Sequence, residues 1–100
     1  MSIRALIIHE RDSVAVMLND IKAGEVADAA LGSEVRPVTA RQDIPFGHKI
    51  AIAPIRRGEK VIKYGEPIGL ATQDIQPGEH VHLHNIESTR GRGDRRAAQS

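Results

Sequence analysis

Two short stretches in the second half of the chain decide its predicted fold. Residues 55–61 read Ile-Arg-Arg-Gly-Glu-Lys-Val and residues 75–81 read Ile-Gln-Pro-Gly-Glu-His-Val, so both follow the pattern Ile-x-x-Gly-Glu-x-Val. Residues 21–26 form a third, looser copy. Glycine suits a tight turn that needs a positive φ, and Pro77-Gly78 is typical of a type II turn. We therefore expect each copy to be a structural turn, with its Ile and Val facing the core on either side.

The aliphatic composition favours strands over helices. The 100-residue chain has 12 Ile and 7 Val against 5 Leu, with one Phe, one Tyr and no Trp. β-branched side chains lose rotamer freedom in helices and pack well on pleated sheets. Short apolar runs between Gly and Pro residues predict strands at 3–8, 14–18, 35–38, 50–53, 61–64, 68–71 and 81–85. The run at 14–18 also fits a helical face, and Pro37 would keep its own strand at a sheet edge.

The end of the chain differs from the body. Residues 88–100 are rich in Arg, Gly, Ser and Ala without apolar periodicity, which predicts a flexible tail or linker after an all-β domain at residues 1–87. Residues 87–100 hold four Arg against two acidic residues, a net of +2, so the chain's net charge of +1 leaves −1 for the body. A nearly neutral body without aromatic platforms predicts no nucleic-acid partner.

Several classes of protein are excluded by what the sequence lacks. Without Cys, the chain has no disulfide, thiolate nucleophile or thiolate zinc site. The N-terminus lacks the features of a secretory signal, and no apolar run approaches the roughly 18 residues of a membrane span. We therefore expect a cytoplasmic protein with no membrane partner. Nucleophile-elbow, Walker and dinucleotide motifs are also missing, which removes the usual signals of acyl transfer, ATP hydrolysis and hydride transfer.

Residues 80–85, His-Val-His-Leu-His-Asn, are the most unusual segment and hold three of the five His. Alternate side chains of a strand share a face, so we expect the three imidazoles on one side, with Val81 and Leu83 in the core. Imidazoles with this spacing can converge on one metal or substrate, and they can move protons near neutral pH. We interpret this face as a functional site, with a merely solvated polar face as the alternative.

A second group of polar residues lies upstream. His48 follows Gly47 and is equally compatible with a loop surface and with a site. Lys63 and Tyr64 are adjacent in a predicted strand, so they face opposite sides and only one can line a given pocket. Lys63 could hold a carboxylate as a point charge, whereas Tyr64 is expected chiefly as an aromatic residue packed on the aliphatic core.

Three segments carry a resemblance to a known family. They are residues 47–51, Gly-His-Lys-Ile-Ala, residues 61–69, Val-Ile-Lys-Tyr-Gly-Glu-Pro-Ile-Gly, and residues 78–85, Gly-Glu-His-Val-His-Leu-His-Asn. Together they resemble the SAF domain of the altronate and galactarate dehydratase family, over roughly residues 5–96. The resemblance implies a β-clip fold and the elimination of water from a sugar acid to give a 2-keto-3-deoxy acid. It also implies a divalent metal such as iron.

The resemblance further implies a divided enzyme. In longer family members this domain precedes a large catalytic domain, whereas this sequence ends just after the linker-like residues 87–94. We therefore expect a hydro-lyase small subunit, inactive without a separate large catalytic subunit that holds most of the metal site; a homo-oligomer is also open. A similar small subunit occurs in sulfolactate sulfo-lyase, which eliminates sulfite, and the sequence does not separate these substrates.

The resemblance places a set of polar residues at the substrate pocket, across the interface with the large subunit. The catalytic candidates are His48, His82 and His84. The substrate-binding candidates are Lys63, Tyr64, His80 and Asn85, and the candidate metal ligands in this chain are His82 and His84. Two other interpretations remain: a non-catalytic module that binds sugar acids, and a structural domain whose histidine face is incidental.

Overall fold

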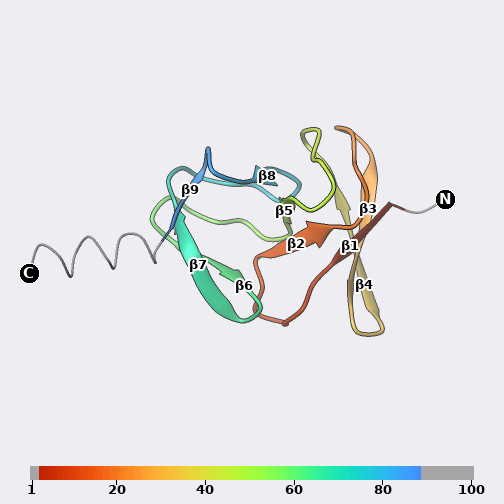
Figure 1. The fold of residues 1–100 in the computed structure, drawn as a ribbon, viewed down its shortest axis with the longest axis horizontal. Coiled ribbons are helices and arrows are strands. Elements are labelled where there is room, and N and C mark those ends of the chain that lie inside the picture. The colour runs from red at the N-terminus through yellow and green to blue at the C-terminus, as the bar shows by residue number, and fades with distance from the viewer. Residues whose placement is uncertain (1–2, 89–100) are drawn as a thin grey trace, which may run out of the picture.

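The fold consists of short strands joined by turns. The computed structural model describes residues 3–88, and over this range the regular elements are all strands (Figure 1). They are β1 (Ile3–Leu6), β2 (Val14–Met17), β3 (Val26–Leu31), β4 (Glu34–Thr39), β5 (Lys49–Ala51), β6 (Lys60–Lys63), β7 (Glu66–Ala71), β8 (His80–Val81) and β9 (Ile86–Ser88). The prediction of a small all-β domain is confirmed, and the ambiguous run at 14–18 forms a strand. Within residues 3–88, no helix is long and apolar enough to cross a membrane.

The strands form two sheets. The larger has six strands in the order β4-β3-β1-β2-β5-β8, and the smaller has three in the order β6-β7-β9. β1 and β3 are parallel, whereas the other neighbours are antiparallel. Pro37 lies in β4 at the edge of the larger sheet, as predicted, because an edge strand tolerates a residue without an N–H. Figure 1 shows the smaller sheet at one end of the molecule and the β3–β4 hairpin at the other.

Two groups of buried aliphatic side chains form the core. The first packs against the larger sheet and includes Met17 and Ile50. The second joins the two sheets, since it contains Val14 of β2 together with Val61 of β6 and Ala71 of β7. Both groups consist of aliphatic residues, in line with the composition.

The Ile-x-x-Gly pattern marks a turn that occurs four times, one more than the sequence analysis found. The fourth copy is residues 44–50. Its Gly47 has a φ of +85°, and the corresponding glycines of the other copies have φ of +93°, +87° and +94°. In each copy the N–H of the residue after the glycine donates to the carbonyl three residues earlier, which with the positive φ defines a type II turn. The copies pair in space through antiparallel bridges, Ile21 with Ile44 and Ile55 with Ile75.

Each turn places two aliphatic residues in the core, as the pattern predicted. The opening Ile is at most 3% exposed in every copy. The residue six positions later is fully buried at 0% in every copy, namely Ala27, Ile50, Val61 and Val81. The looser copy differs from the prediction, because Val26 is exposed and Ala27 takes the buried position.

Aspartates tie the paired turns together. In three copies an Asp directly precedes the Ile. The carboxylate of this Asp accepts a backbone N–H from the paired turn, from the residue two positions after the Ile of that turn. These hydrogen bonds are Asp20–Phe46 at 2.7 Å, Asp43–Ala23 at 2.9 Å and Asp74–Arg57 at 2.9 Å. The fourth bond is absent for a covalent reason: Pro77 has no N–H to donate, and Pro54 stands where the other copies have Asp.

The smaller sheet closes with β9, which pairs with β7. A glycine is needed there, since a Cβ on Gly69 would lie 2.5 Å from the carbonyl oxygen of Glu87. The flexible tail predicted for residues 88–100 lies outside the described residues, apart from Ser88 at the end of β9.

Candidate functional site

Two neighbouring strands of the larger sheet bring histidines together. His48 immediately precedes β5, and His80 opens β8 opposite Ile50 of β5. Alternate residues share a face, so His48, two residues before Ile50, lies on the same side of the sheet as His80. The backbone N–H of His80 also donates to Oε1 of Gln42 at 2.8 Å, which fixes the start of β8.

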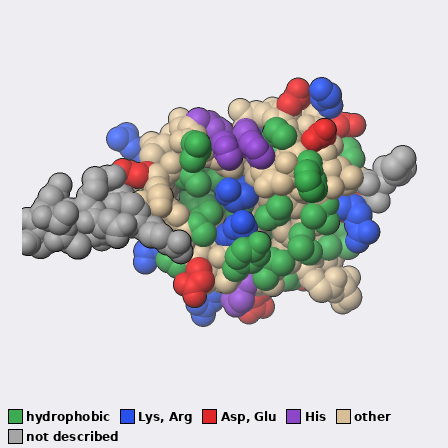
Figure 2. Space-filling view, in the orientation of Figure 1, with side chains coloured by type: hydrophobic (Ala, Val, Ile, Leu, Met, Phe, Trp, Pro, Cys, Tyr) green, Lys and Arg blue, Asp and Glu red, His purple; other side chains and the backbone are tan. Residues whose placement is uncertain are grey.

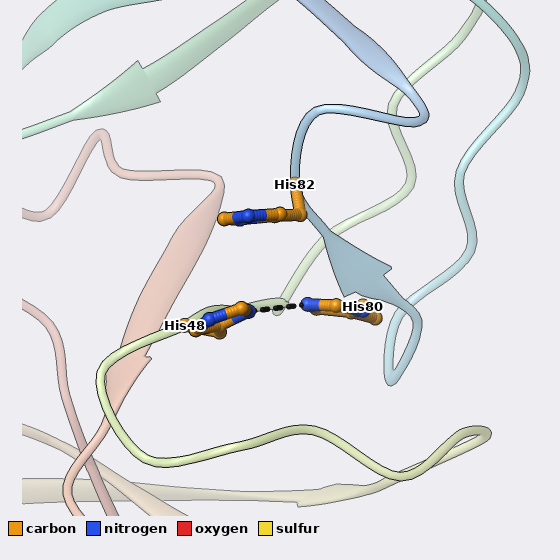
Figure 3. A group of neighbouring side chains, drawn as sticks. All are labelled: His48, His80 and His82. Atoms are coloured by element: carbon orange, nitrogen blue, oxygen red, sulfur yellow. Dashed lines mark hydrogen bonds between the residues drawn. The ribbon is translucent and has the colours of Figure 1, made fainter.

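The imidazoles of His48, His80 and His82 form a compact group, the histidine cluster (Figure 3). Nδ1 of His48 and Nε2 of His80 are 2.9 Å apart and share a hydrogen bond. The ring of His82 stacks on that of His48, with centroids 4.1 Å apart and planes inclined by 17°. His84 reaches the margin of the cluster, its ring centroid 5.2 Å from that of His80. The structure therefore brings together all four histidines that the sequence analysis singled out.

The turn that carries His48 differs from its three counterparts at one position. In those copies a Glu follows the Gly and accepts the backbone N–H three residues before it; the pairs are Glu25–Lys22, Glu59–Arg56 and Glu79–Gln76, at 2.8, 2.7 and 2.8 Å. In the fourth turn that N–H does not exist, because the residue is Pro45. A carboxylate at position 48 would have no such donor, which leaves the position open to an imidazole.

The segment after β8 is a turn, contrary to the predicted strand over residues 81–85. β8 has two residues, and the N–H groups of Asn85 and Ile86 both donate to the carbonyl of His82. The chain therefore reverses direction just after His82. Leu83, which was expected in the core, lies on the outside of this turn and is 83% exposed, so that prediction was wrong.

The side chain of Asn85 causes the reversal. Its Oδ1 accepts the N–H of His82 at 2.9 Å, and its Nδ2 donates to the carbonyl of His80 at 2.8 Å. Such local bonding by Asn competes with continuation of a strand. Asn85 has 0% exposed surface, so in this arrangement it positions the two histidines and offers no surface for the expected substrate contact.

Two histidines of the cluster, His80 and His82, have lowered pKa values. Partial burial, followed by the charges of the other three histidines and Lys49, lowers the pKa of His80 to about 4. Loss of hydration and the neighbouring positive charges also lower the pKa of His82. A neutral imidazole can accept a proton.

The histidine cluster also has the donor set of a divalent-metal site. The ligand nitrogens of His48, His80 and His82 all lie within 4.8 Å of one another. Imidazole nitrogens bind zinc at about 2.0–2.1 Å, so two of them on one ion lie at most about 4.2 Å apart. Three imidazole nitrogens this close together are a donor set suited to zinc, iron or nickel, so the residues fit a metal. This group retains His82 of the expected ligand pair and adds His48 and His80 in place of His84.

Comparison with known proteins decides the family. The family model described as the altronate/galactarate dehydratase SAF domain matches residues 3–89. The chain belongs to this family. The resemblance carried by residues 47–51, 61–69 and 78–85 is thereby confirmed, and the all-strand fold agrees with it.

The relatives of this SAF domain include altronate dehydratases and a sulfo-lyase subunit. The altronate dehydratases of Escherichia coli (strain K12) and Bacillus subtilis (strain 168) are 50% and 43% identical over 85 and 81 residues. Each match covers 81% of this chain but 16% of the relative, so the chain spans about a sixth of their length. The (2R)-sulfolactate sulfo-lyase subunit alpha of Chromohalobacter salexigens is 34% identical over 88 residues, which cover 84% of this chain and 94% of the relative.

Two predicted site residues of the SAF domain lie at the hairpin between β6 and β7 of the smaller sheet. Lys63 ends β6, and Tyr64 begins the turn to β7. Tyr64 was expected in the core, but it is 53% exposed with a φ of 57°, because the chain reverses through Tyr64 and Gly65 in two successive left-handed conformations. The two side chains, expected on opposite faces, meet: Nζ of Lys63 is 4.7 Å from the centroid of the Tyr64 ring, within range of a cation–π interaction.

Lys49 is a candidate to which the sequence analysis gave no role. It opens β5 and is half-buried; partial burial and the charge of Lys63 lower its pKa. Its charge in turn contributes to the lowered pKa of His80 and of His82. The signal was present in the Gly-His-Lys segment at 47–49, where Lys49 directly follows His48.

Proposed function

We propose that this SAF domain is the small subunit of a cytoplasmic carbon–oxygen lyase that dehydrates a sugar acid, such as altronate or galactarate, to a 2-keto-3-deoxy acid. The observation that carries the proposal is the family match over residues 3–89, together with 50% identity to an altronate dehydratase. The domain corresponds to 16% of that relative, so the proposal assigns most of the catalytic machinery to a separate large subunit.

Dehydration needs a base that removes the proton next to the carboxylate and an acid that helps the hydroxyl to leave. His80 stays neutral because its pKa is about 4, so its Nε2 suits the acceptor role toward Nδ1–H of His48. That tautomer leaves Nε2 of His48 with its lone pair, ready to take a proton. His82 and His84, on the turn after β8, are the members we expect to contact the substrate and to return the proton.

A divalent metal, with iron as the family expectation, would supply Lewis-acid assistance to the departing hydroxyl. His48, His80 and His82 are the residues of this chain that would hold it, and the large subunit would provide the remaining ligands. A nitrogen bound to an ion cannot accept a proton. In the metal-loaded enzyme, proton transfer would therefore pass to His84 or to the large subunit.

The test is an assay of the assembled enzyme. The tagged chain is isolated together with its large subunit from its source organism, and dehydration of altronate and galactarate is measured with added iron(II). Replacing His82 and His84 together by Ala should leave assembly intact and lower kcat/KM by at least about 100-fold, since a general acid–base residue contributes about 10²–10⁴. His9→Ala is the matched control, because His9 is the histidine outside the cluster.

The outcomes separate the interpretations. Unchanged kcat and KM in the double variant would contradict the role assigned to the cluster. A chain isolated without a large subunit and without activity would contradict the lyase proposal. Binding of sugar acids by such a lone chain would instead indicate a non-catalytic binding module.

A second candidate is the small subunit of a sulfolactate sulfo-lyase. It is favoured by the match over 94% of the length of the sulfo-lyase subunit alpha, against 16% of the altronate dehydratases. The chemistry is parallel, since a base removes a proton and sulfite leaves in place of hydroxide. Release of sulfite from (2R)-sulfolactate by the same assembled enzyme, without keto-acid formation from altronate, would decide for this candidate.

A further inference from the structure

The two faces of the larger sheet differ in how they are covered. On one face, side chains such as Ala5, Met17 and Ala29 belong to the first core group and are at most 1% exposed. The side chains that alternate with them in β1, β2, β3 and β4 form the opposite face, called here the outer face. A sheet face that meets water is normally polar. The outer face is instead mostly aliphatic, with Leu6 39% and Val35 54% exposed.

The strand register aligns one residue of each strand in a row across the outer face. At one end of the row Val81 is fully buried, because the second core group and the smaller sheet cover the face there. At the other end Val35 is exposed, so the apolar surface continues from the core into solvent. In the view of Figure 2, hydrophobic side chains gather on the surface over β1 and β2, next to the smaller sheet. From β8 to β4 the row is Val81, Lys49, Val16, Leu6, Ala30 and Val35.

Two opposite charges lie beside this row. Arg4 precedes Leu6 by two residues in β1, and Asp28 precedes Ala30 by two residues in β3, so both belong to the outer face. Arg4 is paired with Asp28, and Leu6 with Ala30, in the register of the two parallel strands. Neither charged residue belongs to an ion pair described within residues 3–88. Side by side, β1 and β3 thus present a basic and an acidic residue, and then a large and a small aliphatic residue.

This arrangement is complementary to itself. Most homodimers are related by a two-fold axis, which brings the same patch of both copies together. With the outer faces packed together and the axis running along the strands between β1 and β3, each of these strands lies over the other strand of the second copy. Arg4 then faces Asp28 of the second copy. Leu6 faces Ala30 of the second copy, so a large side chain meets a small one, and both contacts occur twice.

We propose that the outer face of the larger sheet binds a second copy of this chain, in a two-fold dimer centred between β1 and β3. Packed sheets lie about 10 Å apart with their strand directions within about 30° of each other, which such a dimer satisfies. The histidine cluster stays accessible, because His80 pairs with Ile50, whose side chain lies on the opposite face of the sheet. The proposal does not depend on the proposed function.

The experiment measures self-association of the whole chain by sedimentation equilibrium, from micromolar to millimolar concentration. We expect a reversible equilibrium between monomer and dimer. Val35→Lys should weaken dimerisation by at least about 10-fold, because an ammonium group would be placed against an aliphatic surface. Leu83→Lys is the matched control, since Leu83 is also exposed but lies on the turn after β8, away from the outer face. Amide NMR spectra of the variants check that the fold is kept.

An exchange of charge tests the register of the dimer. Arg4→Glu and Asp28→Arg should each weaken self-association by at least about 10-fold, because each places like charges opposite one another twice in the dimer. Mixed in equal amounts, the two variants should form a heterodimer, since both of its contacts again join opposite charges. Mixing could not repair an effect that either substitution has within its own chain.

Each result supports or overturns the proposal. Self-association that Val35→Lys weakens and Leu83→Lys keeps, with recovery when the two charge variants are mixed, would support the dimer. A wild-type chain that stays monomeric, a dimer that Val35→Lys retains, or charge variants that do not associate on mixing would overturn it. If a monomeric chain bound its large subunit and Val35→Lys abolished that binding, the outer face would belong to the large subunit instead. Sedimentation needs neither a large subunit nor turnover, so its failure and that of the lyase assay are independent.

Discussion

The turn at residues 44–48 and the turn at residues 55–59 use one backbone shape for two purposes. Their glycines have φ of +85° and +87°, and both turns close with the same backbone hydrogen bond. At 55–59, Glu59 accepts the N–H of Arg56 at 2.7 Å, which makes it a capped turn. At 44–48, Pro45 offers no N–H, and His48 turns to the histidine cluster. The turn without this backbone donor thus keeps the same shape and leaves the side chain at position 48 free to pair with another strand.

The difference also shows what each kind of turn depends on. The capped turns at 21–25, 55–59 and 75–79 are stabilised by local hydrogen bonds that each turn makes with its own backbone. The imidazole of the histidine turn is held by a ring on another strand, 32 residues away in sequence. Variants at the capped turns should therefore change stability, whereas variants at the histidine turn should change activity.

The largest effect is expected for a glycine that does more than supply a positive φ. Gly78 and Gly58 have φ of +94° and +87°, but a Cβ on Gly78 would collide with the carbonyl oxygen of Thr39, whereas a Cβ on Gly58 has nothing within 4 Å. Gly78→Ala should cost about 4 kcal/mol or more in free energy of unfolding, and Gly58→Ala about 1–2 kcal/mol from left-handed strain alone. Urea unfolding of both variants measures this, and equal losses would contradict the role given to Thr39.

His48→Glu tests the comparison most directly, because it restores the residue of the capped turns. With no N–H on Pro45, the carboxylate should gain no cap, so the melting temperature should stay close to that of the wild type. The assembled enzyme should lose about 100-fold in kcat/KM, or about 2.7 kcal/mol of transition-state stabilisation. An active His48→Glu enzyme would show that position 48 is structural, like position 59.

Much of the fold was predictable because it depends on short stretches of neighbouring residues. Glycine after two variable residues predicted positive-φ turns, and the excess of Ile and Val predicted strands; both features depend on the nearest few residues. The family resemblance could be recognised for the same reason, since residues 78–85 form one continuous motif. One prediction that failed, the strand over residues 81–85, also has a local cause: the side chain of Asn85 ends β8 after two residues and turns Leu83 outward.

The arrangement of the site was not predictable in the same way. His48 approaches His80 because β5 pairs with β8. The residues near His48 and His80 in the sequence do not specify this pairing, since strand partners are chosen by the whole set of buried side chains. The fourth turn, at residues 44–48, could have been found in the sequence, but only by allowing Pro45 and His48 at the two positions that form the Glu cap in the other turns.

Acid pH should separate the histidine cluster from the loop around Asp12, because an imidazole and a carboxylate lose their contributions to stability in different pH ranges. His80 has a pKa lowered to about 4 in the folded chain, so below its ordinary value of 6.5 the unfolded chain binds the proton more readily. Its contribution to stability is present above pH 6.5 and is lost as pH falls toward 4. After allowance for partial exposure we expect a loss on the order of 1–2 kcal/mol, measured by urea unfolding at pH 7 and pH 4.5.

Asp12 is the carboxylate whose protonation should lower stability at a more acid pH. Burial alone would raise its pKa, but backbone N–H groups, with Gly65 foremost, outweigh burial and hold the pKa below 3.8. The stability that Asp12 contributes is therefore present above its ordinary pKa and is lost only as pH falls through the lowered value. His80→Gln should remove the loss of stability between pH 6.5 and pH 4, and Asp12→Asn should remove the loss at lower pH. A single loss of stability that either variant removes would show that the histidine cluster and Asp12 titrate as one unit.

The smallest effect is expected for the reciprocal exchange, Glu59→His. It removes the acceptor of the Arg56 N–H, and a shorter imidazole cannot replace a carboxylate that bonds at 2.7 Å. Loss of one exposed cap should cost about 1 kcal/mol, and Glu59→Gln, which keeps an amide oxygen, should recover most of it.

In the His48→Glu background, Pro45→Ala returns the missing N–H and should stabilise the histidine turn relative to His48→Glu alone, as seen in the urea midpoint. If Pro45→Ala brought no gain there, the missing donor could not be the reason that this turn carries a histidine, and the two turns would differ for a cause outside their own backbones.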